Sequence, residues 1–246
     1  DNFRVVVESY GGIIENYNLG SNFSLNEENL YSFIKDKNPK VVYICNPNNP
    51  TGTVYTFEFC ERIIRDFQDT LFIFDEAYFE FSGITVSSLV NNYSNFIISR
   101  TFSKAFGLAS FRIGYAIGPK EIIDTINKVR NPKNIALISQ VAAIESLKDI
   151  DYMHSFTFEV DNSKSLLEDF LVNQGVHFNS CKGNYIMIKA DSFKKSDMIN
   201  FLHKRDILVR DLGHLDQLSN FFRITIGTVE QTKTVIKNLD RFLNNQ

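Results

Sequence analysis

The chain has 246 residues, a formal net charge of −3, 43% hydrophobic residues and 22% charged residues. This composition provides ample core, offers no basic surface for nucleic acid or an anionic membrane, and contains no apolar run near the roughly 20 residues that span a bilayer. Three widely spaced cysteines and four histidines outside any metal-ligand spacing predict reduced thiols, a cytoplasmic protein and no metal site.

Short apolar runs alternate with helical patterns in the first half of the chain. The runs are rich in β-branched and aromatic residues, as in strands covered on both faces: Val41–Cys45, Leu71–Phe74, Phe96–Ile98 and Tyr115–Ile117. Between them we expect three helices, Leu25–Lys37, Phe57–Phe67 and one that runs from Pro119 to Val129. Ser24 with Glu27 forms a potential capping box for the first helix, and Thr56 can cap the second. This alternation predicts an α/β domain with a mostly parallel sheet.

The pattern changes near residue 135. Two helices, Ile135–Lys148 and Ser155–Gln174, are expected there, and Gly175 can end the second. Short strands follow, together with two more helices, the last of them capped by Thr228 with Gln231: Val176–Asn179, Tyr185–Lys189, Ser196–Arg205, Ile207–Arg210, Phe222–Ile226 and Val229–Leu243. We therefore expect a large domain over residues 1–135 and a small α+β domain over residues 136–246.

The first polar motif is Asn46-Pro47-Asn48-Asn49-Pro50-Thr51-Gly52, directly after a predicted strand. Asparagine and proline form turns by themselves, so a purely structural turn is one interpretation. The other is a ligand loop, because open α/β sheets bind ligands beyond the carboxyl ends of their parallel strands. In that case an asparagine amide can donate to a phenolate oxygen.

The second motif is Asp75-Glu76-Ala77-Tyr78, which follows the strand Leu71–Phe74. A carboxylate at the end of an apolar strand is costly unless it has a cationic partner, and a protonated pyridine nitrogen is one such partner. Tyr78 can then hydrogen-bond a ring hydroxyl. The alternative is that Asp75 caps a helix. Glu76 and Glu80 are expected to face solvent or a subunit interface.

The third motif is a polar turn around Lys104, with Thr101 and Ser103 before it and Arg112 eight residues after it. A lysine that holds an aldehyde as a Schiff base needs a lowered pKa, which burial and a neighbouring cation provide. Hydroxyl groups and a guanidinium are suitable donors to a phosphate dianion. The turn therefore predicts an amine and a phosphate site side by side.

Arg210 and Arg223 each lie within an apolar, strand-like run. An unpaired guanidinium would be costly there, so the pair either forms buried salt bridges, for which Asp211 is available, or binds an anionic substrate. The sequence contains neither Gly-x-Gly-x-x-Gly nor a phosphate-loop motif, so dinucleotide and nucleoside triphosphate chemistry have no support.

In this order, Asn-Pro-Asn-Asn-Pro-Thr-Gly, Asp-Glu-Ala-Tyr and Ser-Lys-Ala-Phe-Gly-Leu-Ala-x-x-Arg-Ile-Gly resemble the motifs of class I and II aminotransferases. These are pyridoxal-phosphate enzymes of fold type I, and the histidinol-phosphate aminotransferase branch is most similar. The resemblance implies a mostly parallel sheet with helices on both faces and a small C-terminal α+β domain. It also implies transfer of an amino group between an amino acid and an oxo or phosphorylated substrate, with pyridoxal 5'-phosphate as cofactor.

The resemblance assigns a role to each candidate residue. Lys104 is implied to be the Schiff-base lysine and proton shuttle, and Asp75 the partner of the pyridine nitrogen. The remaining cofactor contacts are implied to come from ligands of the ring hydroxyl and of the phosphate: Asn49, Tyr78, Thr101, Ser103 and Arg112. Tyr78 counts with Lys104 and Asp75 among the implied catalytic residues. Arg210 and Arg223 are implied to bind an anionic group of the substrate.

The resemblance also implies a homodimer that acts on small amino and oxo compounds in amino-acid biosynthesis. Members of the branch carry an N-terminal segment with a phosphate-binding loop, a stacking aromatic residue and a tyrosine that reaches the neighbouring subunit. We expect a fragment that begins just past this aromatic residue and binds cofactor poorly. Lys133 replaces a usual aromatic residue, which leaves the substrate open. Two alternatives are decarboxylation of an amino-acid phosphate by the same fold and a non-catalytic binding module.

Overall fold

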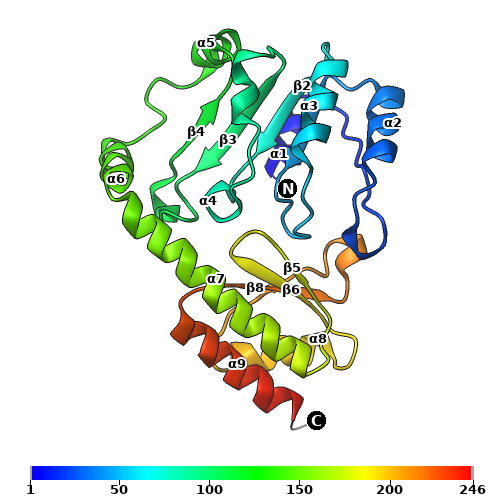
Figure 1. Cartoon of the computed structure of the whole chain (residues 1–246), viewed down its shortest axis with the longest axis vertical. Helices are drawn as coiled ribbons and strands as arrows, with labels where there is room; N and C mark the ends of the chain where they lie inside the picture. Colours follow the sequence, from blue (N-terminus) through cyan, green and yellow to red (C-terminus); the bar gives the residue numbers. More distant parts are fainter. Residues whose placement is uncertain (1, 245–246) are drawn as a thin grey trace.

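The computed structural model describes residues 2–244, and its strands form two separate four-stranded sheets (Figure 1). The first sheet has the order β1-β2-β3-β4, in which β1 to β3 are parallel and β4 runs antiparallel to β3. Its strands are β1 (Val41–Cys45), β2 (Leu71–Asp75), β3 (Phe96–Thr101) and β4 (Gly114–Ile117). The α/β class and the mostly parallel sheet expected from the sequence are confirmed.

The two faces of this sheet differ in burial. Phe72, Phe74, Phe96 and Ile98 lie on one face and are fully buried, in a cluster with residues of α2 (Glu27–Lys37) and α3 (Phe57–Asp66). The residues that alternate with them in β2 are only partly buried. Ile97 of β3 is buried on the opposite face, whereas Val41 and Tyr43 of β1 are exposed there. Within residues 2–244 the expectation of strands covered on both faces therefore holds for β3 and only in part for β1 and β2, on the face that carries Asp75.

The strand β4 departs furthest from the expected pattern. Three of its four residues, among them Tyr115 with 39% of its surface exposed, are open to solvent in the described part of the chain. Between residues 2 and 244, β4 has β3 as its neighbour on one side and no strand on the other. Its apolar sequence resembles a buried strand, but the topology places it at an edge.

The three helices predicted in the first half form close to their predicted limits, as α2, α3 and α5 (Lys120–Val129). The helices α1 (Asn2–Ser9) and α4 (Phe79–Ser82) were not predicted, and short 3-10 turns lie at Ser21–Phe23, Ser87–Asn91 and Ala109–Phe111. The Ser24–Glu27 capping box is wrong, because Asn26 caps α2 by accepting from the Asn29 amide at 2.9 Å. The predicted Thr56 cap of α3 is confirmed by its 3.2 Å bond from the Phe59 amide.

The second sheet is antiparallel throughout, with the order β5-β6-β8-β7. Its strands are β5 (Phe178–Ser180), β6 (Tyr185–Lys189), β7 (Arg210–Asp211) and β8 (Phe221–Thr225), and its helices are α6 (Leu137–Lys148), α7 (Ile150–Asn173), α8 (Lys195–His203) and α9 (Val229–Leu243). The sheet and its helices share a second apolar core around Leu167, Ile186, Leu202 and Phe222. The domain boundary after residue 135 stays a prediction.

Helix α7 and strand β7 differ most from their predicted limits in this half. Helix α7 begins at Ile150 rather than Ser155, because the Asp149 side chain caps it by accepting from the Tyr152 amide at 3.3 Å. The strand expected at Ile207–Arg210 is reduced to β7, which pairs with β8 at only two positions. The capping box of α9 forms as predicted.

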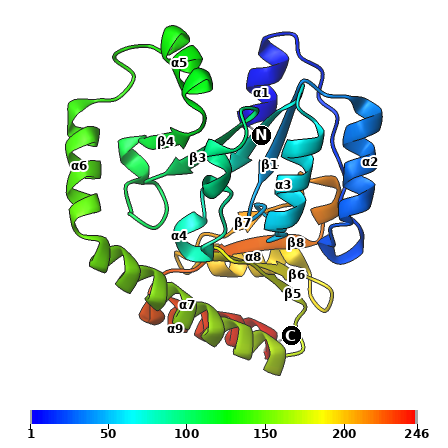
Figure 2. The same cartoon turned by 45° about the horizontal axis from the view of Figure 1, so that its top comes forward.

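The loops at the carboxyl ends of β1 and β2 meet the second sheet. The Tyr185 hydroxyl of β6 donates to the Asn48 carbonyl at 2.8 Å, and Tyr185 packs with Tyr78 and Cys181 in a small buried cluster. Figures 1 and 2 both place α4 where the first sheet approaches the second. None of the helices between residues 2 and 244 combines the length and apolarity that a membrane span requires.

Candidate functional site

Asp75 is the last residue of β2, and both of its carboxylate oxygens accept hydrogen bonds. Oδ1 accepts from the Ala77 amide at 3.1 Å, and Oδ2 accepts from the hydroxyl of Tyr43. Burial and the neighbouring carboxylate raise the pKa of Tyr43, so its hydroxyl stays protonated and donates. Asp75 does not cap α4, whose first turn begins after Tyr78 without a side-chain cap.

Tyr43 is a site residue that sequence reasoning missed. In the parallel pair β1–β2, Cys45 lies opposite Asp75, and Tyr43 lies two residues earlier on the same face. The available signal was this spacing from the strand end, but the register of the two strands is needed to use it.

Asn49, Tyr78 and Arg223 form a chain of hydrogen bonds across the two sheets. Nη1 of Arg223, on β8, donates to Oδ1 of Asn49 at 2.6 Å, and Nδ2 of Asn49 donates to the Tyr78 hydroxyl at 3.1 Å. Tyr78 is 3% exposed, and burial raises its pKa. The structure therefore unites three residues that the sequence separates widely.

Lys104 lies in the turn after β3, with Nζ 5.5 Å from the centre of the Tyr78 ring. Partial burial lowers the pKa of Lys104, the positive charge of Arg223 lowers it further, and Asp75 acts in the opposite direction. The pKa direction that the sequence predicts is thus found. An amine that loses its proton more readily is a better nucleophile and base near neutral pH.

Thr101, Ser103 and Arg112 belong to the same β3–β4 connection. The Thr101 hydroxyl accepts from the Ser103 amide at 3.1 Å, so these two residues form a compact turn directly before Lys104. Arg112 has an exposed side chain, and its Nη1 donates to the Ala109 carbonyl at 3.0 Å. The structure therefore groups the two hydroxyl residues with Lys104, whereas the Arg112 guanidinium is held at its own loop.

Arg210 and Arg223 lie directly opposite each other in the β7–β8 pair. The alternative of a salt bridge to Asp211 does not hold, because Asp211 accepts from Lys195 Nζ at 2.5 Å and from the Gly213 amide at 2.8 Å. Nε of Arg223 is buried and has no hydrogen-bond partner among residues 2–244. Arg210 is exposed at the surface of the sheet.

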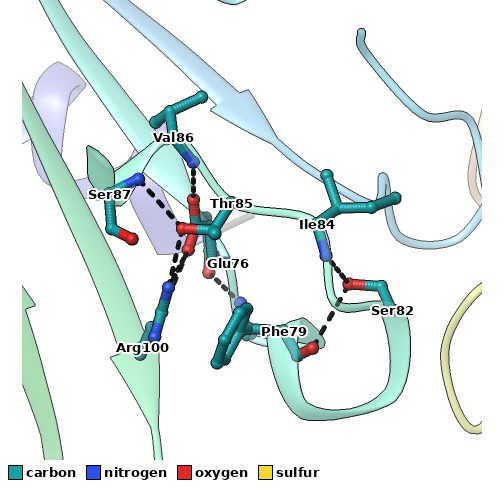
Figure 3. Close-up of polar contacts among 10 residues, drawn as sticks. Glu76, Phe79, Ser82, Ile84, Thr85, Val86, Ser87 and Arg100 are labelled. Atoms are coloured by element: carbon teal, nitrogen blue, oxygen red, sulfur yellow. Dashed lines mark hydrogen bonds and ion pairs between the residues drawn. The ribbon is translucent and has the colours of Figure 1, made fainter. Parts of the chain in front are cut away.

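The expectation that Glu76 faces solvent or a subunit interface is wrong. Its side chain is 2% exposed and forms an ion pair with Arg100, whose side chain is 8% exposed (Figure 3). Alternation along β2 turns Glu76 to the core face, opposite to Asp75. Glu80 is half-buried, its Oε2 has no partner within the described chain, and burial raises its pKa.

The chain is a member of the class I and II aminotransferase family, because residues 1–239 match the model of that family. It is 40% identical to the dihydroxyacetone phosphate transaminase of Campylobacter jejuni over 250 residues, which cover 100% of this chain and 67% of the relative. It is 34% identical to the histidinol-phosphate aminotransferase of Thermoanaerobacter sp. over 226 residues, which cover 92% of this chain and 63% of the relative.

A solved structure supports the fold. This chain superposes with a TM-score of 0.87 on the histidinol-phosphate aminotransferase of Sinorhizobium meliloti, which was determined in complex with pyridoxal-5'-phosphate. The two are 24% identical, and the match covers 99% of this chain and 67% of the other. The fold implied by the sequence motifs is thereby confirmed. The chain spans about two thirds of the length of these proteins.

Proposed function

We propose that this chain transfers amino groups between an amino acid and a phosphorylated oxo compound, with pyridoxal phosphate as cofactor. The observation that carries the proposal is the hydrogen-bond chain from Arg223 through Asn49 to Tyr78, beside the lowered-pKa amine of Lys104. The site thus combines the Arg223 guanidinium, which suits an anion, with the Lys104 amine. Asn49 and Tyr78 supply two groups suited to a phenolate oxygen. Family membership supports the same reaction.

The residues present fit this cofactor and substrate. Asp75 accepts hydrogen bonds from two neutral donors, the Tyr43 hydroxyl and the Ala77 amide. Because neither donor is charged, the Asp75 carboxylate can still neutralise a cation such as a protonated pyridine nitrogen. Arg223 keeps a buried donor, Nε, without an acceptor in residues 2–244. An unpaired buried donor is costly, and an anionic substrate group would satisfy it.

When bound, pyridoxal phosphate supplies an aldehyde for an amine and a ring that accepts the electrons of a broken Cα–H bond. Lys104 Nζ would hold the aldehyde and, once free, would move the proton from the substrate Cα to C4′ of the cofactor, and in the opposite direction in the second half of the reaction. Asp75 would keep the ring nitrogen protonated, while Asn49 and Tyr78 would hold the ring oxygen. Hydrogen bonds hold Asp75, Asn49 and Tyr78 in place within this chain, and groups oriented before the reaction stabilise developing charge.

The phosphate sites are proposed on two different elements. Thr101 and Ser103 would donate to the cofactor phosphate from the turn before Lys104. Arg112 would donate to the same phosphate from the end of the β3–β4 loop. Arg223, and Arg210 across the strand pair, would bind the substrate. The names of both curated relatives contain a phosphorylated compound, which favours a phosphate over a simple carboxylate at these arginines.

The experiment begins with borohydride reduction of the protein loaded with pyridoxal phosphate. Peptide mass spectrometry should find the added phosphopyridoxyl mass on the peptide that contains Lys104, and Lys104→Ala should lose it. Glutamate and dihydroxyacetone phosphate are then supplied as amino donor and acceptor. Formation of 2-oxoglutarate supports transamination, whereas release of carbon dioxide without an oxo product contradicts it.

The assembly is proposed on the family resemblance alone, and the location on the reduced thiols that the composition predicts. We propose a homodimer in the cytoplasm, in which the subunits contribute to each other's sites. Light scattering of the purified protein tests the dimer, and a mass equal to a single chain contradicts it.

A further inference from the structure

The ion pair between Glu76 and Arg100 is unusually complete. Nε and Nη2 of Arg100 donate to the same oxygen, Oε2 of Glu76, at 2.9 and 2.8 Å. Nη2 also donates to the Thr85 hydroxyl at 2.7 Å. Oε1 of Glu76 accepts from the Val86 amide at 2.9 Å, so both carboxylate oxygens have partners (Figure 3).

The same network holds the segment after the Asp-Glu-Ala-Tyr motif. The Arg100 guanidinium lies 3.4 Å from the centre of the ring of Phe79, and Phe79 is the first residue of α4. Tyr78 therefore lies between two anchored neighbours, Glu76 on one side and Phe79 on the other. The loop after α4 is held at the same ion pair, because Thr85 accepts from Arg100 and the Val86 amide donates to Glu76. Residues 76–86 therefore surround the guanidinium.

Both partners are adjacent in sequence to proposed site residues. Glu76 follows Asp75, and Arg100 precedes Thr101. Asp75 lies opposite Ser99 in the β2–β3 pair, and the Glu76 amide donates to the Ser99 carbonyl at 2.9 Å. Alternation therefore puts Asp75 and Thr101 on one face of the sheet and the ion pair on the other, directly behind them.

Overall stability is a poor explanation for this arrangement. Burying two charges costs several kcal/mol per ion, and apolar residues of similar volume often fill such positions equally well. A planar guanidinium with several fixed donors provides something apolar packing does not, namely a defined direction for each attached segment. Here the attached segments are the one that carries Asp75 and Tyr78 and the one that carries Thr101 and Lys104.

We propose that Glu76 and Arg100 are positioning residues, which fix the Asp75–Tyr78 segment relative to the Thr101–Lys104 turn and so set the orientation of the bound cofactor. This inference rests on the proposed function. It assigns the pair no contact with cofactor or substrate, since the pair lies on the core face of the sheet. Its effect passes through the backbone of two adjacent strands.

The decisive variant is Arg100→Lys, which keeps the positive charge. It loses the paired Nε and Nη2 donors to Glu76 and the planar guanidinium over the Phe79 ring. The matched control is Arg62→Lys. Arg62 also binds a glutamate, Glu28, through two nitrogens and lies 4.2 Å from the centre of the Tyr31 ring, but its pair is exposed and joins α2 to α3 rather than the strands that end at the site. Both variants are compared with the wild-type holoenzyme well below their unfolding temperatures.

Two readouts separate positioning from a merely structural role. The first is the Kd of pyridoxal phosphate, and the second is the visible circular dichroism of the bound cofactor, which reports its orientation. We expect Arg100→Lys to raise Kd by about tenfold, because displacing the Asp75–Tyr78 segment weakens several cofactor contacts of a preorganised site at once, and to change the circular dichroism. Arg62→Lys should leave both unchanged.

A second variant covers the case in which Arg100→Lys does not fold. The double substitution Glu76→Leu with Arg100→Met removes both charges together, so no unpaired charge is buried, and it should fold with the same loss of affinity and altered spectrum. Affinity and spectrum equal to wild type in either folded variant, even with a lower Tm, overturn the inference. Failure of the wild type itself to bind pyridoxal phosphate overturns the proposed function, and the inference with it.

Discussion

Arg223 and Asn49 are joined by a 2.6 Å hydrogen bond, although 174 residues separate them in the chain. Arg223 comes from a strand of the second sheet, and Asn49 comes from the loop after the first strand of the first sheet. Asn49 in turn donates to Tyr78, so a group proposed to bind substrate is hydrogen-bonded to the groups proposed to bind the cofactor oxygen.

The first prediction concerns Arg223→Lys. The guanidinium has several donors in a fixed plane, so it can donate to Asn49 and to an anionic substrate group at once. A lysine ammonium cannot reproduce this arrangement. Hydrogen bonds to charged groups contribute about 1.5–3 kcal/mol, so we expect kcat/KM for the phosphorylated substrate to fall by roughly 10- to 100-fold. Steady-state kinetics measures this loss. Arg210→Lys, at an exposed position opposite Arg223, should cost less, and equal losses would contradict a leading role for Arg223.

The second prediction concerns Tyr43→Phe, which removes the hydroxyl that donates to Asp75. Hydrogen bonds to charged groups contribute about 1.5–3 kcal/mol, and Tyr43 is partly exposed, so we expect the free energy of unfolding to fall by about 1–2 kcal/mol and binding of pyridoxal phosphate to weaken. Urea denaturation and cofactor titration measure the two effects. Tyr93→Phe is the matched control, because Tyr93 donates to the Glu61 carboxylate at 3.1 Å away from the site. If both variants bind cofactor like wild type, Tyr43 does not support Asp75.

Local sequence signals were sufficient for much of the fold. Strands β1 and β6 and helix α9 have the predicted limits, because dense apolar runs and a capping box specify them within a few residues. The exposure of β4 and the short length of β7 were not predictable in this way. Both depend on how many strands pair with each and at how many positions, which the residues of a single apolar run do not specify.

The same distinction applies to the site. Asp75 was identifiable because a carboxylate at the end of an apolar strand is costly without a cationic partner. Asn49, Tyr78 and Lys104 were identifiable because their motifs follow apolar strands in an order that resembles the family. Tyr43 was missed because its role requires the register between β1 and β2. The Glu76–Arg100 pair was also missed, since two residues separated by 24 positions meet only when β2 and β3 are paired.

The third prediction is a pH dependence that arises from Lys104. Its pKa is lowered in the folded state from the ordinary value of 10.5, so the unfolded chain binds the proton more tightly. The free energy of unfolding therefore rises with pH between the folded pKa and about 10.5, and below that window the buried charge destabilises the fold. Lys104→Met, which carries no charge, should be more stable than wild type near neutral pH in the absence of cofactor.

This stability difference between Lys104→Met and wild type should shrink as pH approaches 10.5. Urea denaturation of both proteins across the pH range measures it, and groups common to both proteins cancel in the difference. A difference that is independent of pH would show that the Lys104 pKa is not lowered by folding.

The fourth prediction concerns Gly52, which lies at the contact between the two sheets. Its φ is +78°, and a Cβ atom added there would lie 2.6 Å from Cys181 Cβ and 2.8 Å from the Ser180 carbonyl oxygen. Gly175 has a similar φ of +65°, but a Cβ atom there would have no neighbour within 4 Å. Both Gly→Ala substitutions incur backbone strain of about 1–2 kcal/mol, and only Gly52→Ala adds steric overlap, which typically costs a further 1–3 kcal/mol or so.

The two variants should also differ in activity. The Gly52 amide donates to the Asn48 carbonyl at 2.8 Å, so displacing Gly52 from Cys181 moves the loop that carries Asn49. Gly52→Ala should therefore reduce both the free energy of unfolding and kcat/KM, whereas Gly175→Ala should reduce only the former. Urea denaturation and steady-state kinetics on the same preparations provide both values. Equal activity in the two variants would show that the position of the Asn49 loop does not depend on its contact with the second sheet.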